Sequence, residues 1–335
     1  MACTLGLLHA LHGAYPGARI AWAIQPEFAP LVESLEALER TILFERRGGL
    51  GAWWRLRREL RGFAPDLVLD AQGNLKSAAV TWLSGAPRRL GMARAHWQER
   101  LGHWVLSESA PEIRASEGQH LVGRMRGLVQ HLLGSQPSVQ QVPTAPSQAE
   151  LAAGEALLAR DFGPLGAPLL ISLSTPGDPR GWSAARWSQL LASLEDSGRA
   201  VLVLQGPAEA QRARELQAQL PERAGLRHWA PAMELRCLVG LLAAAATRGS
   251  RFLGVDSGPM HLAWSSGLPV TVLEGPCDAA RTGPWPLGAG LHRVVRASQQ
   301  PSCAPCFKRR CQHPEGNLCM QDIRPEEVLE ALGPA

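Results

Sequence analysis

The chain has 335 residues, enough for two domains that each bury a core. Its longest nearly uniform apolar run, 238–246, is too short to cross a bilayer, and no basic segment precedes the apolar residues 5–11 as in a signal peptide. The net charge of +4 is too small to indicate a partner by itself, and seven cysteines fit reduced thiols better than a secreted disulfide framework. These features predict a cytoplasmic protein without a transmembrane segment.

The first half of the chain alternates expected helices and strands. Helices are predicted at 4–13, 27–38, 53–60, 76–83 and 121–133, and strands at 19–25, 41–44, 66–70 and 89–92. This alternation is typical of an α/β domain with a largely parallel sheet. A parallel βαβ unit needs both of its strands, yet no strand precedes the first helix. We therefore expect either a true start upstream of Met1 or a domain without its first, usually central, strand.

A basic segment with two tryptophans follows the strand at 41–44. It contains Arg46, Arg47, Trp53, Trp54, Arg55, Arg57, Arg58 and Arg61. Basic side chains beside amphipathic rings suit a polyanionic partner or a membrane surface. A solvated helix face with two packing tryptophans explains the same residues equally well. Because the domain shows no recognisable nucleic-acid-binding motif, nucleic acid is the weaker partner hypothesis.

A polar, proline-rich segment without periodicity divides the chain, and we interpret residues 135–149 as a linker. The N-terminal domain is then 1–134, a second α/β domain is 150–323, and a C-terminal helix lies in 324–335. In the second part, helices are predicted at 150–159, from Ser183 to 194, from the end of segment 206–209 to 220, at 235–246 and at 325–332. Strands are predicted at 168–174, 201–205, near 228, at 252–255 and at 269–273. The cleft between two such halves is the default ligand site.

The most informative stretch runs from Phe252 to Gly283. A short apolar strand ends in Asp256, Ser257 and Gly258 form a turn, and Pro259 suits the first position of a helix that carries His261. The free N–H groups and the positive dipole end of such a helix make a site for phosphate. An ordinary strand, turn and helix without a ligand accounts for these residues equally well.

Five segments, taken in order, resemble glycosyltransferase family 9, the ADP-heptose lipopolysaccharide heptosyltransferases. They are DLVLDAQGNLKSA, PRRLGMARAHWQER, DPRGWSAARW, GPAE, and GVDSGPMHLA with GPCDAARTGPW. The resemblance implies an α/β GT-B fold of two Rossmann-like domains, with the nucleotide sugar held mainly by the second. It also implies inverting, metal-independent transfer of a heptose or related sugar from an ADP-activated donor to a lipopolysaccharide inner-core acceptor at the cytoplasmic membrane face.

The resemblance also assigns roles to single residues. Ser257, Gly258 and Pro259 would meet the diphosphate, Asp256 and His261 would flank the donor sugar, Arg180 would offset the charge of the leaving phosphate, Glu209 would bind the ribose, and the backbone of Met233 would meet the adenine. Acceptor candidates are Arg46, Arg47, Arg55, Arg57 and Arg58, with Lys76, Arg88, Arg89 and Arg94 as further ones. Each of three residues also has a purely structural alternative. In these alternatives Arg180 does no more than pair with Asp178, Glu209 does no more than cap its helix, and His261 is a satisfied core histidine.

The chain departs from the family pattern at its start. Family members begin with a strand and a Ser-x-Gly-Asp loop whose aspartate is thought to deprotonate the acceptor, and this chain begins after that loop. General-base help contributes about 10²–10⁴-fold in rate. The alternative to an active transferase is therefore a catalytically weak or inactive GT-B protein that binds a nucleotide sugar. In addition, Pro259 removes one amide donor, and Cys277 stands where a threonine is common.

Four cysteines near the C-terminus, Cys303, Cys306, Cys311 and Cys319, have the spacing C-x2-C-x4-C-x7-C. The spacing suits a structural zinc ion, because the first pair can hold one side of a tetrahedral ion and the others can close it. A cysteine-rich loop typical of the family, reduced or partly disulfide-bonded, explains the same pattern. If zinc is bound, a nucleic-acid-binding protein with a zinc module is a third, less favoured hypothesis.

Overall fold

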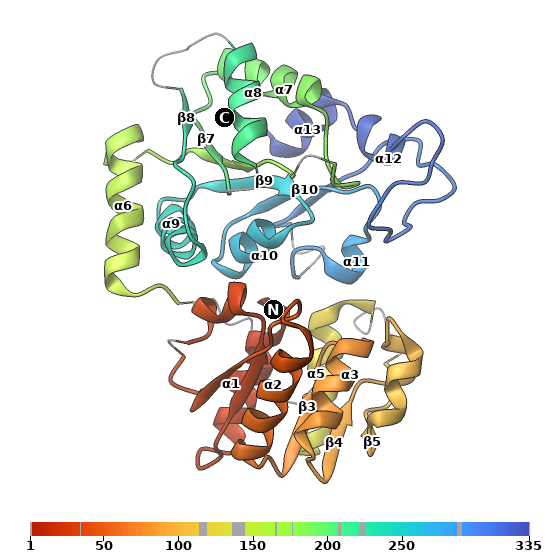
Figure 1. Ribbon diagram of the computed structural model, residues 1–335. Coiled ribbons are helices and arrows are strands. Elements are labelled where there is room, and N and C mark those ends of the chain that lie inside the picture. Colours follow the sequence, from red (N-terminus) through yellow and green to blue (C-terminus); the bar gives the residue numbers. More distant parts are fainter. Residues whose placement is uncertain are drawn as a thin grey trace. The chain divides into compact units, whose positions relative to one another are not determined.

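Two compact units make up the chain, Met1–Val142 (unit 1) and Pro143–Ala335 (unit 2). The computed structural model in Figure 1 describes residues 2–33, 35–113, 119–135, 145–164, 166–175, 177–206, 209–220, 226–286 and 290–334. Most of the predicted linker, residues 136–144, lies outside the described residues, so the division at 1–134, 135–149, 150–323 and 324–335 stays a prediction. None of the helices within the described ranges is both long enough and apolar enough to span a bilayer.

Unit 1 consists of short parallel strands joined by helices. Its elements are α1 (Ala2–Ala14), β1 (Ala21–Ile24), η1 (Pro26–Leu31), β2 (Arg40–Leu43), α2 (Gly49–Phe63), β3 (Leu67–Asp70), α3 (Leu75–Ser84), β4 (Arg88–Gly91), η2 (Arg94–His96), η3 (Arg100–Val105), β5 (Glu108–Ser109) and α5 (Leu121–Leu133), where η denotes a 3-10 helix. Local sequence sets the bounds of α3. The Asn74 side chain accepts hydrogen bonds from the N–H groups of Lys76 and Ser77, and Gly85 ends the helix with φ +72°.

The helix predicted at 27–38 is wrong. Among the described residues of this range, only η1 is helical, and turns follow it. Pro30 explains the difference, because proline lacks an N–H group and its ring clashes with the carbonyl four residues earlier in an α-helix. The sequence also gave no indication of β5, η2 and η3, since each spans six residues or fewer and is too short for a periodic apolar pattern.

The helices of unit 1 take part in several separate hydrophobic cores. Helices α1 and α5 pack together, and Leu7 and Met125 from them meet Leu90 of β4. Helix α2 packs beside α3, and its Leu56 is buried with Ile42 of β2 (Figure 1). Helix α3 also packs on η3. Elements α2, α3 and η3 therefore form one continuous layer of the unit.

The strands of unit 1 fall into two parallel sheets, β1-β2 and β3-β4-β5. In a doubly wound sheet of strand order 3-2-1-4-5-6, the strand that comes first in the chain lies between these two groups. The split is therefore the arrangement expected of a sheet without its central strand. The missing first strand stays a prediction.

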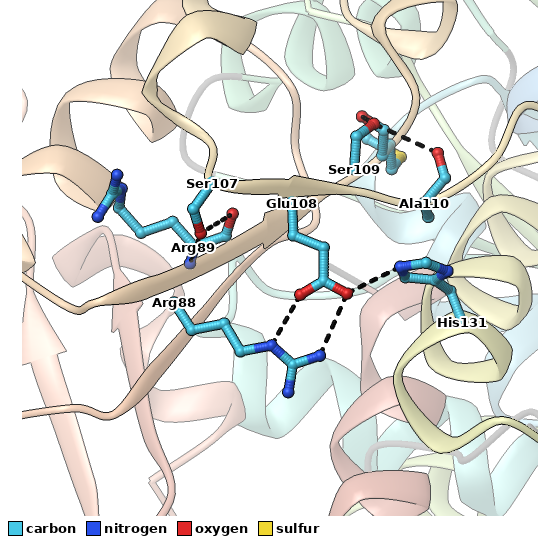
Figure 2. Close-up of polar contacts among 8 residues, drawn as sticks. Arg88, Arg89, Ser107, Glu108, Ser109, Ala110 and His131 are labelled. Atoms are coloured by element: carbon cyan, nitrogen blue, oxygen red, sulfur yellow. Dashed lines mark hydrogen bonds and ion pairs between the residues drawn. The ribbon is translucent and has the colours of Figure 1, made fainter.

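Polar contacts join β4, β5 and α5 at one edge of unit 1 (Figure 2). The Arg88 guanidinium donates to both carboxylate oxygens of Glu108 at 2.7 and 3.2 Å, and Nε2 of His131 lies 2.9 Å from the same carboxylate. The hydrogen bond from Arg88 lowers the pKa of Glu108. Arg89 donates to two backbone carbonyl oxygens, both at 2.7 Å. Arg88 and Arg89, two of the further acceptor candidates, therefore make hydrogen bonds within unit 1.

Unit 2 contains a six-stranded, fully parallel sheet of order β11-β10-β9-β6-β7-β8. Its elements are α6 (Gln148–Phe162), β6 (Leu169–Ser172), α7 (Ala184–Asp196), β7 (Val201–Leu204), α8 (Ala210–Gln219), β8 (Arg227–Trp229), α9 (Leu235–Thr247), β9 (Arg251–Val255), α10 (Gly258–Ser265), β10 (Val270–Leu273), α11 (Ala279–Thr282), β11 (Arg293–Val295), α12 (Leu318–Gln321) and α13 (Pro325–Leu332). The predicted doubly wound α/β class is confirmed for this unit. The order of the strands reverses between β6 and β9.

Helices cover the sheet of unit 2 on both faces (Figure 1). Side chains of α7, α8 and α13 share one large core with the sheet, in which Trp182 and Trp187 are fully buried and their rings meet edge to face at 5.0 Å. Helices α6 and α9 approach very closely. A Cβ atom at Gly154 would lie 2.6 Å from the Gly240 carbonyl oxygen, so only glycine fits there.

Candidate functional site

The candidate site of unit 2 lies where the carboxyl ends of four strands bring polar loops together. Arg180 follows β6, Glu209 follows β7, Asp256 follows β9 and Thr282 follows β10. The strand order reverses between β6 and β9, so the loops after these two strands lie at a topological switch point. Open α/β sheets bind ligands in the crevice that such a reversal creates at the carboxyl ends of the strands. Residues 176 and 207–208 of the surrounding loops lie outside the described residues.

The Asp256 carboxylate contacts three other side chains of the site. Its Oδ1 lies 3.1 Å from Nε2 of His261, and its Oδ2 accepts a hydrogen bond of 3.0 Å from the Thr282 hydroxyl. The carboxyl group is 14% exposed, and burial by itself would raise its pKa. Hydrogen bonds from His261, Cys277 and Thr282 outweigh burial and lower the pKa. Asp256 is therefore an ionised carboxylate at neutral pH.

His261 links Asp256 to α10. The indole Nε1 of Trp264 donates to Nδ1 of His261 at 3.3 Å. Since Nδ1 accepts this bond, the neutral ring carries its proton on Nε2, which faces Asp256. The imidazole side chain is 26% exposed, so it is not a fully buried core residue. Both ring nitrogens have partners, so the role of His261 beside the donor sugar stays a prediction.

Arg180 makes both local and longer-range contacts. Its Nε and Nη2 atoms donate to the two carboxylate oxygens of Asp178 at 2.8 and 2.5 Å, and its Nη1 donates to the backbone oxygen of Asp256 at 2.6 Å. The hydrogen bond with Asp178 raises the pKa of Arg180, which is a permanent cation. The alternative that Arg180 only pairs with Asp178 is therefore incomplete, because the guanidinium also reaches the turn after β9.

The N-terminus of α10 presents an open polar surface. Ser257 is the N-cap, yet its side chain caps no N–H group, and its Oγ is buried without a partner among the described residues. A Cβ atom built at Gly258 would meet nothing within 4 Å. Pro259 lies in the first turn, at the second helical position and not at the predicted first one, and supplies no N–H group there. The turn thus combines a helix N-terminus, an orphan hydroxyl group and free space.

Glu209 and Met233 lie beyond the neighbouring strands. The Glu209 carboxylate accepts hydrogen bonds from the Thr175 hydroxyl at 2.5 Å and from the Gly206 N–H group at 3.0 Å. It occupies the N-cap position of α8, but its side chain caps no N–H group of that helix, so the simple capping alternative is wrong. Met233 is half-buried in the loop between β8 and α9.

The segment after β10 contributes further residues, of which only Cys277 was singled out in the sequence. Besides Thr282, it carries Cys277, and burial, followed by the nearby Asp256, raises the pKa of this thiol. Glu274, at the end of β10, is 2% exposed and pairs with Arg296, which also lies 3.4 Å from Asp278. Burial raises the pKa of Glu274 to about 7. The one signal in the sequence was position, since all these residues follow the strand next to β9.

The five predicted acceptor arginines lie in unit 1, in and just before α2. Arg46, Arg47 and Arg58 are exposed. Arg55 pairs with Glu45 at 3.0 Å, and the Arg57 guanidinium lies 5.5 Å from the centre of the Trp54 ring, a cation–π distance. The chemistry of all five fits an anion.

All six cysteines whose side chains are described are free thiols. Four of them, Cys303, Cys306, Cys311 and Cys319, line one pocket together with His313. Within the described residues, however, no group of three or more His, Cys, Asp or Glu side chains is arranged to hold a metal ion. The pocket also touches the loop after β10, because the Cys306 N–H group bonds to the Pro276 oxygen at 3.1 Å.

A parallel sheet with a reversal of strand order and helices on both faces places unit 2 in the class of doubly wound, Rossmann-like α/β proteins. Residues 53–316 match the model of glycosyltransferase family 9 (heptosyltransferase). The chain is 31% identical over 329 residues to lipopolysaccharide heptosyltransferase 1 of Pseudomonas aeruginosa, covering 94% of this chain and 86% of that protein. The chain therefore belongs to glycosyltransferase family 9, which makes it a glycosyltransferase.

Solved structures agree with this assignment. The structure of Escherichia coli heptosyltransferase WaaC with ADP is similar at a TM-score of 0.66 and 25% identity, covering 98% of this chain and 91% of that one. The family 9 glycosyl transferase of Veillonella parvula shares the fold at a TM-score of 0.74 and 18% identity, covering 99% of this chain and 92% of that one. The predicted GT-B type fold is confirmed.

Proposed function

We propose that the chain transfers a heptose, or a related sugar, from an ADP-activated donor to a lipopolysaccharide inner-core acceptor. Membership of the family, the likeness to lipopolysaccharide heptosyltransferase 1 and the solved relative with ADP support this proposal. In unit 2, the single observation that carries it is the turn from Asp256 to Gly258, where an orphan hydroxyl group and open space meet a helix N-terminus. This combination fits a diphosphate.

In an inverting transfer, the acceptor hydroxyl oxygen attacks the anomeric carbon of the sugar while the bond to the β-phosphate oxygen breaks. The leaving ADP gains negative charge. Arg180, next to the turn, would offset this charge, and a cation already fixed by Asp178 needs no reorganisation when the charge develops. The ionised Asp256, with His261 behind it, would lie beside the sugar as the anomeric centre becomes positive. Glu209 would accept hydrogen bonds from the ribose hydroxyls, and the backbone of Met233 would meet the adenine.

No described residue is assigned as the base that takes the proton of the acceptor hydroxyl group. A GT-B protein that binds the nucleotide sugar but transfers it slowly or not at all stays the second candidate function.

The acceptor side of the proposal belongs to unit 1. Exposed arginines at positions 46, 47 and 58 suit the phosphate and carboxylate groups of an inner-core lipid. Such a lipid would be met at the cytoplasmic face of a membrane, so we place the protein there as a peripheral enzyme. Metal-independent transfer belongs to the same proposal.

A structural zinc ion at the four C-terminal cysteines stays a separate proposal. It is supported by their spacing and by the pocket that they share, and it requires side-chain movement, since the described geometry holds no metal. Metal analysis of the purified protein, with Cys303→Ser as comparison, tests it. A zinc content near zero in both proteins would exclude it.

The nucleic-acid hypothesis has a test of its own. Retention of the protein on a nucleic-acid column at low salt would support this hypothesis.

Calorimetric titration with ADP-heptose and with ADP tests the donor assignment, and acceptor-dependent ADP release tests transfer. Arg180→Ala should weaken binding of both nucleotides. Arg160→Ala is the matched control, because Arg160 also pairs with a neighbouring aspartate through two bonds, of 2.6 and 2.9 Å, but lies in α6. No measurable binding of either nucleotide by the parent protein would refute the donor assignment. Binding without transfer would favour the second candidate function.

A further inference from the structure

Three neighbouring elements of unit 1 each expose a leucine and a tryptophan. The pairs are Leu50 and Trp54 on α2, Leu75 and Trp82 on α3, and Leu101 and Trp104 on η3, with exposures of 83, 67, 47, 59, 74 and 74%. The three tryptophans are the exposed ones among the residues that the structure describes. Most large apolar side chains of the chain are buried instead, so this concentration calls for an explanation.

Each pair lies on a single face of its element. The spacings are four residues in α2, seven in α3 and three in the 3-10 helix η3, and each of these brings side chains back to the same side. The inward face is filled by other residues, such as Leu56 in α2 and Ala78 in α3. Since α3 packs on both α2 and η3, the three pairs belong to one layer (Figure 1). We call the outward side of this layer the Leu/Trp face.

Positive charge predominates within the three elements of the Leu/Trp face, although Glu45 pairs with Arg55 and Glu99 accepts a hydrogen bond from the Leu75 N–H group. Within α2, α3 and η3 the basic residues are Arg55, Arg57, Arg58, Arg61, Lys76 and Arg100, and Glu59 is the one acid. The Arg57 guanidinium lies over the Trp54 ring, so cation and aromatic ring form one surface feature. Amphipathic rings beside arginines are suited to the boundary between lipid headgroups and acyl chains.

We propose that the Leu/Trp face docks the protein onto an anionic lipid bilayer, with Trp54, Trp82 and Trp104 entering the interface. A second copy of the chain fits less well, because a symmetric dimer would bring the same basic surface against itself. The arginines match anionic headgroups, and the six apolar side chains match the acyl boundary beneath them. This inference deepens the proposed function, since a lipid-linked acceptor is presented at such a surface. It involves no residue of the donor site.

Vesicle co-sedimentation of the full chain tests the proposal. The probes are vesicles of phosphatidylcholine with and without phosphatidylglycerol. We expect binding to the anionic vesicles, weakened by salt, and a loss of about tenfold for each tryptophan replaced, about 100-fold for the double variant Trp82→Ser/Trp104→Ser. The matched control is Tyr15→Ser/Phe28→Ser, which replaces two side chains of unit 1 that are 44 and 40% exposed and lie on other elements. The control should bind as the wild type does.

The outcomes separate this proposal from the proposed function. Thermal unfolding of both double variants should match the wild type, and their calorimetric affinity for ADP should be unchanged, because the replaced side chains are exposed and lie outside unit 2. Normal ADP binding with lost vesicle binding supports docking whether or not sugar transfer is detected. Three results would overturn the docking proposal: equal binding by the Trp82→Ser/Trp104→Ser variant, no preference of the wild type for anionic vesicles, or an oligomer that this variant abolishes while vesicle binding persists.

Discussion

His261 and Asp256 form one hydrogen-bonded pair across the N-terminal end of α10, with Nε2 of the imidazole 3.1 Å from Oδ1 of the carboxylate. Trp264, which donates to Nδ1, fixes which ring nitrogen carries the proton. The pair therefore positions an ionised carboxylate at the opening of the crevice. Removing either side chain therefore takes a hydrogen-bond partner from the other.

The first prediction concerns this pair. His261→Ala removes one of the hydrogen bonds that lower the pKa of Asp256, so that pKa should rise. We expect donor affinity or turnover to fall by about 10–100-fold, the size expected for a hydrogen bond to a charged group, and His261→Gln to restore part of the loss. Calorimetry with ADP-heptose measures the change. His131→Ala, which removes a histidine–carboxylate pair of 2.9 Å in unit 1, should leave donor affinity unaltered.

The second prediction concerns pH and Glu274. Burial raises the pKa of this group from 4.5 to about 7, so the folded protein holds a proton that the unfolded chain releases over this range. The contribution of Glu274 to stability is therefore fully present below pH 4.5, falls as pH rises to 7, and stays low above it. The full change is about 3 kcal/mol.

Urea unfolding at several pH values tests this sign. Glu274→Gln should flatten the decline between pH 5 and 7 relative to the wild type, and the exposed Glu215→Gln should not. A parallel decline in the wild type and in Glu274→Gln would contradict the assignment.

The sequence predicted the turn of the site well because its signals are local. An apolar run that ends in Asp256, small residues, and a proline at the start of a helix determine the geometry within ten residues. The helix predicted at 27–38 does not form for an equally local reason, because Pro30 interrupts it. Local structure that depends on neighbouring residues can therefore be predicted from the sequence when every residue of the segment, prolines included, is considered.

The partners of Asp256 could not be predicted, because they depend on pairing between distant strands. Thr282 reaches Asp256 only since β10 lies parallel to β9 with Val255 opposite Leu273. Nothing in the sequence specifies this register. Similarly, the contact of Arg180 with the Asp256 carbonyl oxygen joins residues 76 positions apart through the pairing of β6 with β9. Contacts of this kind are determined by how the strands pair in the sheet, not by residues that are close together in the sequence.

The third prediction concerns Thr282, a positioning residue that acts through Asp256. Thr282→Val keeps the side-chain shape but removes the hydroxyl group that donates to Oδ2 at 3.0 Å. We expect a stability loss of about 1 kcal/mol and an upward shift in the pKa of Asp256. The pH profile of donor binding, followed from pH 3 to 7, should therefore move to higher pH. Thr282→Ser, which retains the hydroxyl group, should restore the wild-type profile, and a residue that only fills space would show no such rescue.

The last prediction separates binding from folding at Ser257. Its buried Oγ has no partner among the described residues, so Ser257→Ala removes an unsatisfied polar atom and should leave the free energy of unfolding unchanged or slightly higher. If that oxygen meets the donor phosphate, the same variant should bind ADP about 10-fold more weakly, since a hydrogen bond to a charged group is lost. Ser266→Ala, at the other end of α10, is the control and should bind ADP as the wild type does. Calorimetry and urea unfolding on the three proteins give both quantities. Unchanged ADP affinity in Ser257→Ala would show that the hydroxyl group faces no ligand and would remove this residue from the proposed phosphate site.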